Sequence, residues 1–142
     1  SAAFSPDGTL VLTSELMVLS LWVVETGKRL RTMRGHRGEI GAAAFSPDGA
    51  SVLTASDDNT AKLWSIELGL CLCSLEGHRD AVRCAVFSPD GTLVLTASDD
   101  RRAKLWNARD GERLHTLRGH GAEVNFATFS PDGAWVLTAS DD

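Results

Sequence analysis

A 42-residue repeat runs through this 142-residue chain and restricts its fold more than any other feature. Residues 35–76 align with residues 77–118 without a gap, and 23 of the 42 positions are identical. Residues 119–142 begin the same unit again, whereas residues 1–34 form a shorter, altered unit without its opening segment. A repeat of this length is typical of architectures in which one small unit stacks on copies of itself.

Within each unit, short apolar segments alternate with turn residues, a pattern that predicts four strands and no helix. In the second complete unit we expect strands at Ala81–Phe87, Leu93–Ser98, Ala103–Asn107 and Arg113–Arg118. Ser-Pro-Asp-Gly follows the first strand of every unit and suits a type I turn, because Pro sets φ at its second position and Gly suits its fourth. A single four-stranded unit cannot bury both of its faces, so we predict an all-β fold of radially stacked antiparallel sheets, the blades of a β-propeller.

These units resemble the WD repeats. The resemblance rests on Gly-His-Arg at Gly35 and Gly77, on Phe-Ser-Pro-Asp-Gly from Phe45, Phe87 and Phe129, and on the segments SDDNTAKLW and SDDRRAKLW. It covers essentially the whole chain, although the residue after Trp, often Asp in that family, is Val23, Ser65 or Asn107. The strands expected here make about three and a half blades, whereas propellers close with about four to eight. We therefore expect an incomplete ring whose remaining blades belong to a parent chain.

The segment LTASDD, which recurs in three units, places a Ser and an Asp at a constant distance from a preceding His. In the propellers that this chain resembles, such residues form a hydrogen-bonded tetrad with the Trp of the third strand. Carried over, the resemblance implies two complete tetrads, His36, Ser56, Asp58 and Trp64, and His78, Ser98, Asp100 and Trp106. It also implies two partial ones, Ser14 with Trp22, and His120 with Ser140 and Asp142. Thr54 and Thr96, two positions earlier on the same strand face, are the alternative hydroxyl members.

The same residues permit a hydrolase interpretation, which we weigh against the structural one. Catalysis requires an exposed nucleophile, a pocket and an oxyanion hole, and such a site is normally built once. This constellation instead recurs wherever the repeat is intact, so we predict no catalytic residue. A metal site at Asp57 and Asp58 rests on an Asp-Asp pair that is common in turns, and we predict neither a metal nor a cofactor.

Charge and composition narrow the class of partner. The net charge of −5 gives no general attraction to nucleic acid or to an anionic membrane surface. The longest nearly apolar run, Leu16–Val24, is far shorter than the ~20 residues that a membrane-spanning helix needs. The chain opens without a recognisable signal peptide, and its three cysteines are too few and too irregularly spaced for a disulfide framework. We therefore expect a cytoplasmic or otherwise intracellular protein that binds neither nucleic acid nor membrane.

The function that we predict is a non-catalytic scaffold for protein–protein interaction. Strand alternation places the loop before the first strand and the turn after the second strand on one face, where the repeats differ most. The candidate residues for binding a protein or peptide partner are Arg37, Glu39, Asp57, Arg79, Asp80, Asp99, Arg101 and Arg102. One alternative is a purely structural segment of a longer repeat array in a signalling protein. The other is a hydrolase or ligand-binding propeller, which would require a closed ring and a central pocket.

Overall fold

The computed structural model describes every residue from Ser1 to Asp142, and its regular structure consists of strands alone. In chain order the strands are β1 (Ala2–Phe4), β2 (Leu10–Glu15), β3 (Val18–Val23), β4 (Arg29–Arg34), β5 (Ile40–Phe45), β6 (Ser51–Ser56), β7 (Ala61–Ser65), β8 (Cys71–Leu75), β9 (Val82–Phe87), β10 (Leu93–Ser98), β11 (Arg102–Asn107), β12 (Arg113–Leu117), β13 (Val124–Phe129) and β14 (Val136–Ser140). They form three four-stranded antiparallel sheets, β1–β4, β5–β8 and β9–β12, and one two-stranded sheet, β13–β14. The predicted all-β fold of four-stranded antiparallel units is confirmed.

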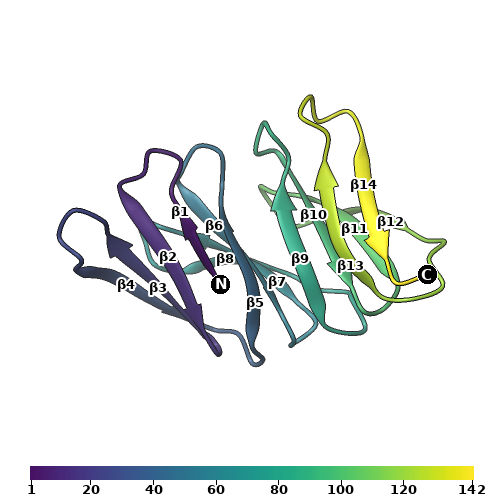
Figure 1. Ribbon diagram of the computed structural model, residues 1–142, viewed down its shortest axis with the longest axis horizontal. Helices are drawn as coiled ribbons and strands as arrows, with labels where there is room; N and C mark the ends of the chain where they lie inside the picture. Colours follow the sequence, from purple (N-terminus) through teal and green to yellow (C-terminus); the bar gives the residue numbers. More distant parts are fainter.

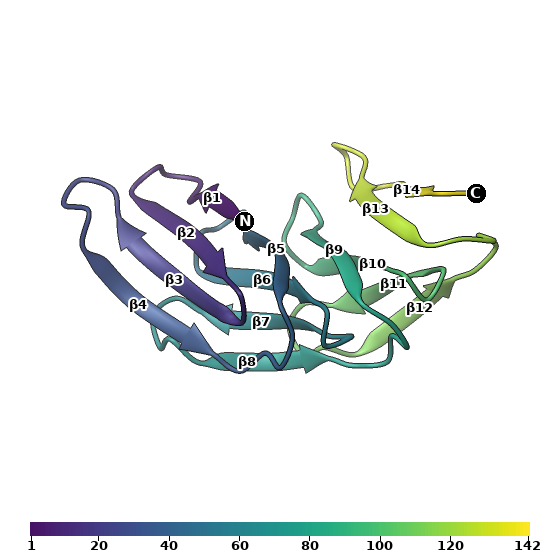
Figure 2. The same ribbon diagram turned by 60° about the horizontal axis from the view of Figure 1, so that its bottom comes forward.

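The sheets stand face to face in chain order, like the leaves of an open fan (Figures 1 and 2). In Figure 2 the last strands β4, β8 and β12 lie along the outer side, while the first strands β1, β5, β9 and β13 lie on the opposite side. Phe and Pro residues that end these first strands line one common hollow of about 520 Å³. The first strands therefore surround a shared axis, as the inner strands of propeller blades do, but the sheets do not close into a ring.

Apolar side chains fill the space between each pair of neighbouring sheets. On β6, Val52 joins the cluster shared with the first sheet, and the next residue, Leu53, joins the cluster shared with the third sheet. A third cluster, which includes Leu95 and Val124, joins the third sheet to β13–β14. Because both faces of an inner sheet are buried, its second strand is apolar on both sides, which explains the unbroken apolar start of Val-Leu-Thr-Ala-Ser.

The Ser-Pro-Asp-Gly turn is built by its own side chains. The Ser46 hydroxyl donates to the carboxylate of Asp48 and accepts the Ser51 amide at 2.9 Å, while the Gly49 amide closes the turn on the Ser46 carbonyl at 2.9 Å. Gly49 has a φ of +72°, in the left-handed region that glycine occupies without a steric penalty. The equivalent hydrogen bonds recur from Ser5, Ser88 and Ser130, so this turn joins the first two strands of every sheet.

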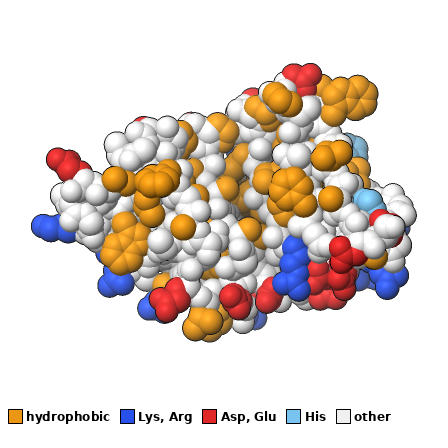
Figure 3. Space-filling view, in the orientation of Figure 1, with side chains coloured by type: hydrophobic (Ala, Val, Ile, Leu, Met, Phe, Trp, Pro, Cys, Tyr) orange, Lys and Arg blue, Asp and Glu red, His pale blue; other side chains and the backbone are white.

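On the face of the molecule seen in Figure 3, charged and hydrophobic side chains are unevenly distributed. In Figure 3 charged groups gather along the lower margin, where Figure 1 places the turns that follow the second strands and the loops that precede the first strands. Hydrophobic groups dominate the upper part, on the side of the Ser-Pro-Asp-Gly turns. No segment forms a helix of the length and apolarity needed to cross a membrane.

Candidate functional site

A buried hydrogen-bonded network links the loop before the second sheet to strands β6 and β7 and to the turn between them. The ring of His36 contacts the Asp58 carboxylate through Nδ1 at 2.7 Å and the Thr54 hydroxyl through Nε2 at 2.7 Å. The indole Nε1–H of Trp64 donates to the same hydroxyl at 2.9 Å. The third sheet repeats this geometry with His78, Asp100, Thr96 and Trp106, at 2.8, 2.8 and 2.9 Å. We call each set the His–Thr–Asp–Trp network.

The expected hydroxyl member, Ser56 or Ser98, is wrong, and the neighbouring threonine takes its place. Thr54 lies opposite Lys62 in the β6–β7 register, and the indole of Trp64, whose backbone lies opposite Val52, extends along the strand to reach it. Ser56 instead accepts the Asp58 amide at 3.2 Å. In the third sheet Ser98 likewise accepts the Asp100 amide and donates to the Asp80 carbonyl at 3.0 Å. The two serines therefore bind the turn, not the Trp.

The partners of each histidine define where its protons lie. Because a carboxylate only accepts, Nδ1 of His36 carries the hydrogen toward Asp58, and a neutral ring then accepts the Thr54 hydroxyl at Nε2. Burial lowers the pKa of His36, although the hydrogen bond to Asp58 opposes this shift, and His78 follows the same pattern. Burial also favours a higher pKa for Asp58, but hydrogen bonds from Thr60, the Arg37 amide and His36 outweigh it and lower the pKa to about 2. The network thus pairs a neutral imidazole with an ionised carboxylate.

The first sheet contains only part of the network, and its hydroxyl is not the one expected. Trp22 donates to Thr13 at 2.9 Å, whereas Ser14 donates to the Ile40 carbonyl at 3.2 Å. The hairpin between β2 and β3 is one residue shorter than its equivalent in the second sheet, so counting back from Trp22 selects the wrong position. A one-residue change of this kind moves a side chain to the other face of a strand.

In the last pair of strands the hydroxyl member also differs from the expectation. His120 contacts Asp142 at 3.0 Å and Thr138 at 2.9 Å, while Ser140 accepts the Asp142 amide at 3.4 Å. The threonine is therefore the partner of the histidine in three of the repeats, and it contacts the Trp wherever the third strand is present.

The chemistry open to these networks follows from their burial. The residues Thr54, Ser56, Thr96 and Ser98 are all 0% exposed. A nucleophile must reach its substrate, and none of these hydroxyls can do so while the sheets remain packed. No group of three or more His, Cys, Asp or Glu side chains is arranged to hold a metal ion. The geometry suits a structural role, in which each network anchors a loop and a turn to the sheet.

The candidate partner-binding residues lie at the same end of the sheets as these anchored loops. Arg37, Glu39, Asp57, Arg79, Asp80 and Arg101 are exposed, and Arg102 and Asp99 are half-buried. Arg101 has a φ of +66°, the left-handed conformation that Asn59 adopts at the equivalent position with a φ of +70°. Asparagine tolerates this conformation better than arginine does.

Arg83, which we did not identify from the sequence, organises part of this face. Its guanidinium contacts Asp57 of the second sheet at 2.9 Å and Asp99 of its own sheet at 2.9 Å. The equivalent residue of the last pair, Asn125, bonds Asp141 in the same way at 2.6 Å. The sequence signal that could have identified Arg83 is that the second residue of the first strand varies between repeats. This residue lies beside the aspartate that begins the turn after the second strand.

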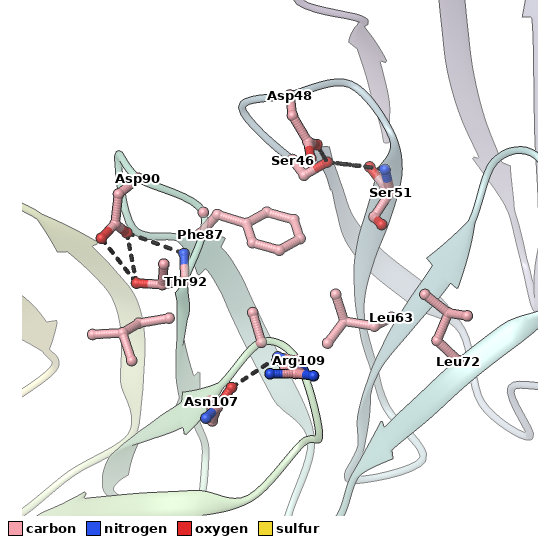
Figure 4. Close-up of a pocket in the computed structure, with 13 residues that line it drawn as sticks. Ser46, Asp48, Ser51, Leu63, Leu72, Phe87, Asp90, Thr92, Asn107 and Arg109 are labelled. Carbon is pink, nitrogen blue, oxygen red and sulfur yellow. Dashed lines mark hydrogen bonds between the residues drawn. The ribbon is translucent and has the colours of Figure 1, made fainter.

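A hollow of about 520 Å³ lies between the second and third sheets at the opposite end, near the Ser-Pro-Asp-Gly turns. Figure 4 shows Leu63, Leu72 and Phe87 around it, with Arg109 on the turn between β11 and β12. None of the residues expected to form a site lines this hollow. The Ser46 and Thr92 hydroxyls at its edge donate to the carboxylates of Asp48 and Asp90 within their own turns.

Comparison with known proteins agrees with this architecture. The WD domain, G-beta repeat family matches residues 27–65, 69–107 and 111–142. Among curated relatives, apoptotic protease-activating factor 1 of Mus musculus is 38% identical over 60 residues, which are 42% of this chain and 5% of the relative. Nuclear distribution protein PAC1 of Arthroderma otae is 39% identical over 62 residues, 44% of this chain and 13% of the relative. Pre-mRNA-processing factor 19 homolog 2 of Arabidopsis thaliana is 36% identical over 59 residues, 41% and 11% respectively.

The chain thus spans only a small part of these relatives, between 5 and 13% of their lengths. The family matches start 42 residues apart and cover most of the chain. They accompany antiparallel sheets stacked around a shared axis, two of which contain the complete His–Thr–Asp–Trp network. The chain belongs to the WD-repeat family.

Proposed function

We propose that the chain binds a protein partner through the loops at the end of the second and third sheets where the His–Thr–Asp–Trp networks lie. Proteins of the WD-repeat family serve as non-catalytic interaction scaffolds, and this chain fits that function. The proposed repeat units are residues 1–34, 35–76, 77–118 and 119–142, and the two central units each begin with such a loop.

The observation that carries this proposal is the contrast between the buried network and the loops that it supports. The networks of the second and third sheets agree to within 0.1 Å in each hydrogen bond. The loops differ in charge and shape, because Gly38 is replaced by Asp80, and Asn59 by Arg101. Backbone strain at a residue such as Arg101 persists where the surrounding structure imposes it, and it is frequent at binding sites.

Chemistry and charge support a protein partner over other classes. The net charge of −5 disfavours nucleic acid and anionic membrane as general partners. The mixed charges on this face, with Arg83 between Asp57 and Asp99, match the alternating charges of a peptide better than a uniform polyanion. All three cysteines are free, which supports the intracellular location that we infer.

The test exchanges loop residues between repeats. In D80G/R101N, two loop residues of the third repeat become those of the second, and the network is untouched. The matched control R109N/E112Q removes one charge of each sign at the opposite end of the same sheet. We expect a partner captured by the wild type and identified by mass spectrometry to be lost with D80G/R101N and kept with R109N/E112Q.

Retention of that partner by D80G/R101N would contradict the proposed surface. If the wild type captured nothing above the level of an unrelated β-sheet protein, the alternative of a purely structural segment would be favoured. Isothermal titration with a purified partner would then give the size of the loss, for which we expect at least a tenfold weakening. This corresponds to about 1.4 kcal/mol.

A further inference from the structure

Four cationic side chains gather on one face of the third sheet, next to the carboxylate of Asp100. They are Arg102 and Lys104 on β11, Arg113 on β12, and Arg118 immediately after β12. None of them takes part in an ion pair of the chain. We call this set the cationic strip.

The strand register brings these side chains together. Lys104 lies opposite Thr116, and Ala103 lies opposite Leu117, so continuation of the ladder places Arg102 opposite Arg118. Side chains two positions apart share a face of the sheet. Arg113 reaches the same region, because a Cβ added at Gly77 would lie 3.2 Å from its Nη1 and 3.9 Å from the Lys104 Nζ.

The equivalent place in the second sheet is balanced in charge and satisfied in hydrogen bonds. There Lys62 donates to Ser74 at 2.8 Å, and Thr60 donates to the free oxygen of Asp58 at 2.6 Å. Glu76 and Asp58 face Lys62 and Arg37 around a hollow of about 230 Å³. Three substitutions between repeats create the difference, because Thr60 becomes Arg102, Cys71 becomes Arg113 and Glu76 becomes Arg118.

The arginines of the cationic strip do not compensate for the lost contacts. Oδ1 of Asp100 is buried and has no hydrogen-bond partner, although Arg102 follows it by two residues. Lys104 is 2% exposed, and burial lowers its pKa; Arg113, Arg102 and Arg118 lower this pKa further, while Asp100 opposes the shift. The strip therefore holds mutually repelling charges, and a bound anion would relieve this repulsion.

We propose that the cationic strip binds a phosphate monoester carried by a protein partner. Two arginine forks can hold phosphate oxygens by paired hydrogen bonds, and the lysine adds a point charge beside them. A phosphorylated serine, threonine or tyrosine offers about −1.5 to −2 charge on a compact group that fits a strip of this size. The inference rests on the proposed scaffold function only for the source of the phosphate.

The overall charge favours a single phosphate group over a polyanion. The chain as a whole carries a net charge of −5, so the flanking phosphates of a nucleic acid would meet a repulsive surface. A short peptide with one phosphate would place its charge on the strip and its neutral backbone along the adjoining loop. The strip is next to the loop that begins at Gly77, which also carries Arg79 and Asp80.

The experiment measures binding of a glycine-flanked phosphoserine pentapeptide to the 142-residue chain by isothermal titration, with the serine pentapeptide, inorganic phosphate and a single-stranded oligonucleotide as comparisons. We expect the phosphopeptide to bind at least tenfold more tightly than the serine peptide. R102T/R118E, which installs the second-repeat residues, should weaken phosphopeptide binding at least tenfold. R109N, which removes a positive charge from the opposite end of the sheet, should leave it unchanged.

A reciprocal graft keeps the test decisive if the first variant is poorly folded. T60R/C71R/E76R, made in the R102T/R118E background, should restore phosphopeptide binding in the second repeat. Equal binding of the serine peptide and the phosphopeptide, or equal loss with R109N, would overturn the inference. Tighter binding of the oligonucleotide, or binding of inorganic phosphate without the phosphopeptide, would reject a protein-borne phosphate. D80G/R101N leaves the strip intact, so failure of the loop surface and failure of the strip are distinguishable.

Discussion

Replacement of Thr96 by valine tests the central structural conclusion, that a threonine hydroxyl joins the histidine to the tryptophan. Thr96 is 0% exposed, accepts the Trp106 Nε1–H at 2.9 Å and donates to His78 Nε2 at 2.8 Å. Valine has nearly the same shape, so the change opens no cavity. It leaves one buried donor and one buried acceptor without a partner.

The expected cost follows from these two orphaned groups. Each buried polar group that loses its partner costs about 1–3 kcal/mol, so the pair costs about 2–6 kcal/mol. The added methyl group of valine recovers about 0.8 kcal/mol of apolar burial. We therefore expect Thr96→Val to lower the free energy of unfolding by about 3 kcal/mol, in the lower half of that range. At about 3 °C per kcal/mol for a chain of this length, Tm should fall by roughly 10 °C.

Urea denaturation followed by tryptophan fluorescence and circular dichroism would measure this change, with Ser98→Ala as the matched control. Ser98 bonds the turn at the Asp100 amide and the preceding loop at the Asp80 carbonyl. Asp80 is exposed and Asp100 is half-buried, so water can replace the lost contacts and Ser98→Ala should cost about 1 kcal/mol. In a double-mutant cycle, Thr96→Val and His78→Ala should be coupled by at least about 1 kcal/mol, whereas Ser98→Ala and His78→Ala should be additive. A larger loss with Ser98→Ala than with Thr96→Val, or no coupling between Thr96 and His78, would refute the assignment.

Three further predictions concern the same supporting structure. The free energy of unfolding should fall as the pH decreases from 7 to 5. Burial lowers the pKa of His36 and His78, so the unfolded chain takes up protons in this range that the folded chain does not. Urea midpoints that rise on acidification would contradict this prediction. Gly38→Ala should cost about 1–3 kcal/mol, since its Cβ would lie 2.6 Å from the Asp58 amide nitrogen, whereas Gly41→Ala, with no atom within 4 Å, should leave Tm nearly unchanged. Arg101→Asn should raise the free energy of unfolding by about 0.5–1 kcal/mol, because it relieves a left-handed arginine at a φ of +66°; calorimetry that shows a lower Tm would refute this.

The strands and turns could be predicted because their signals are local. Ser-Pro-Asp-Gly contains every group that closes the turn, as the bonds of Ser46 to Asp48 and Gly49 show. The 42-residue repeat then gave the number of sheets, and the two apolar faces of each sheet required that the sheets stack on one another. Prediction of the fold needed no long-range information beyond that repetition.

The hydroxyl member of the network could not be chosen from sequence spacing alone. Thr54 and Ser56 lie on the same face of β6, and both are 0% exposed. The choice depends on how far the Trp64 indole extends along the strand: from the level of Val52 it reaches Thr54 and not Ser56, which lies nearer the turn. The prediction of Ser14 was wrong for a related reason. The β2–β3 hairpin is one residue shorter than the β6–β7 hairpin, so the same number of residues counted back from Trp22 ends at a different strand position. The contact of Arg83 with Asp57 was missed because it joins residues from different sheets.

The separation between support and loop explains how one repeat can diverge without loss of its fold. Asp58 and Asp100 accept equivalent hydrogen bonds from a histidine and a backbone amide, yet only Asp58 also accepts Thr60. The third repeat therefore retains its His–Thr–Asp–Trp network although Arg102 stands where the second repeat has Thr60. One carboxylate oxygen of Asp100 is left without a hydrogen-bond partner. Substitutions in the turn alter the charge presented to a partner while the histidine, threonine and tryptophan beneath keep their geometry. For this reason exchange of residues 101 and 102 between repeats should transfer recognition and leave the fold in place.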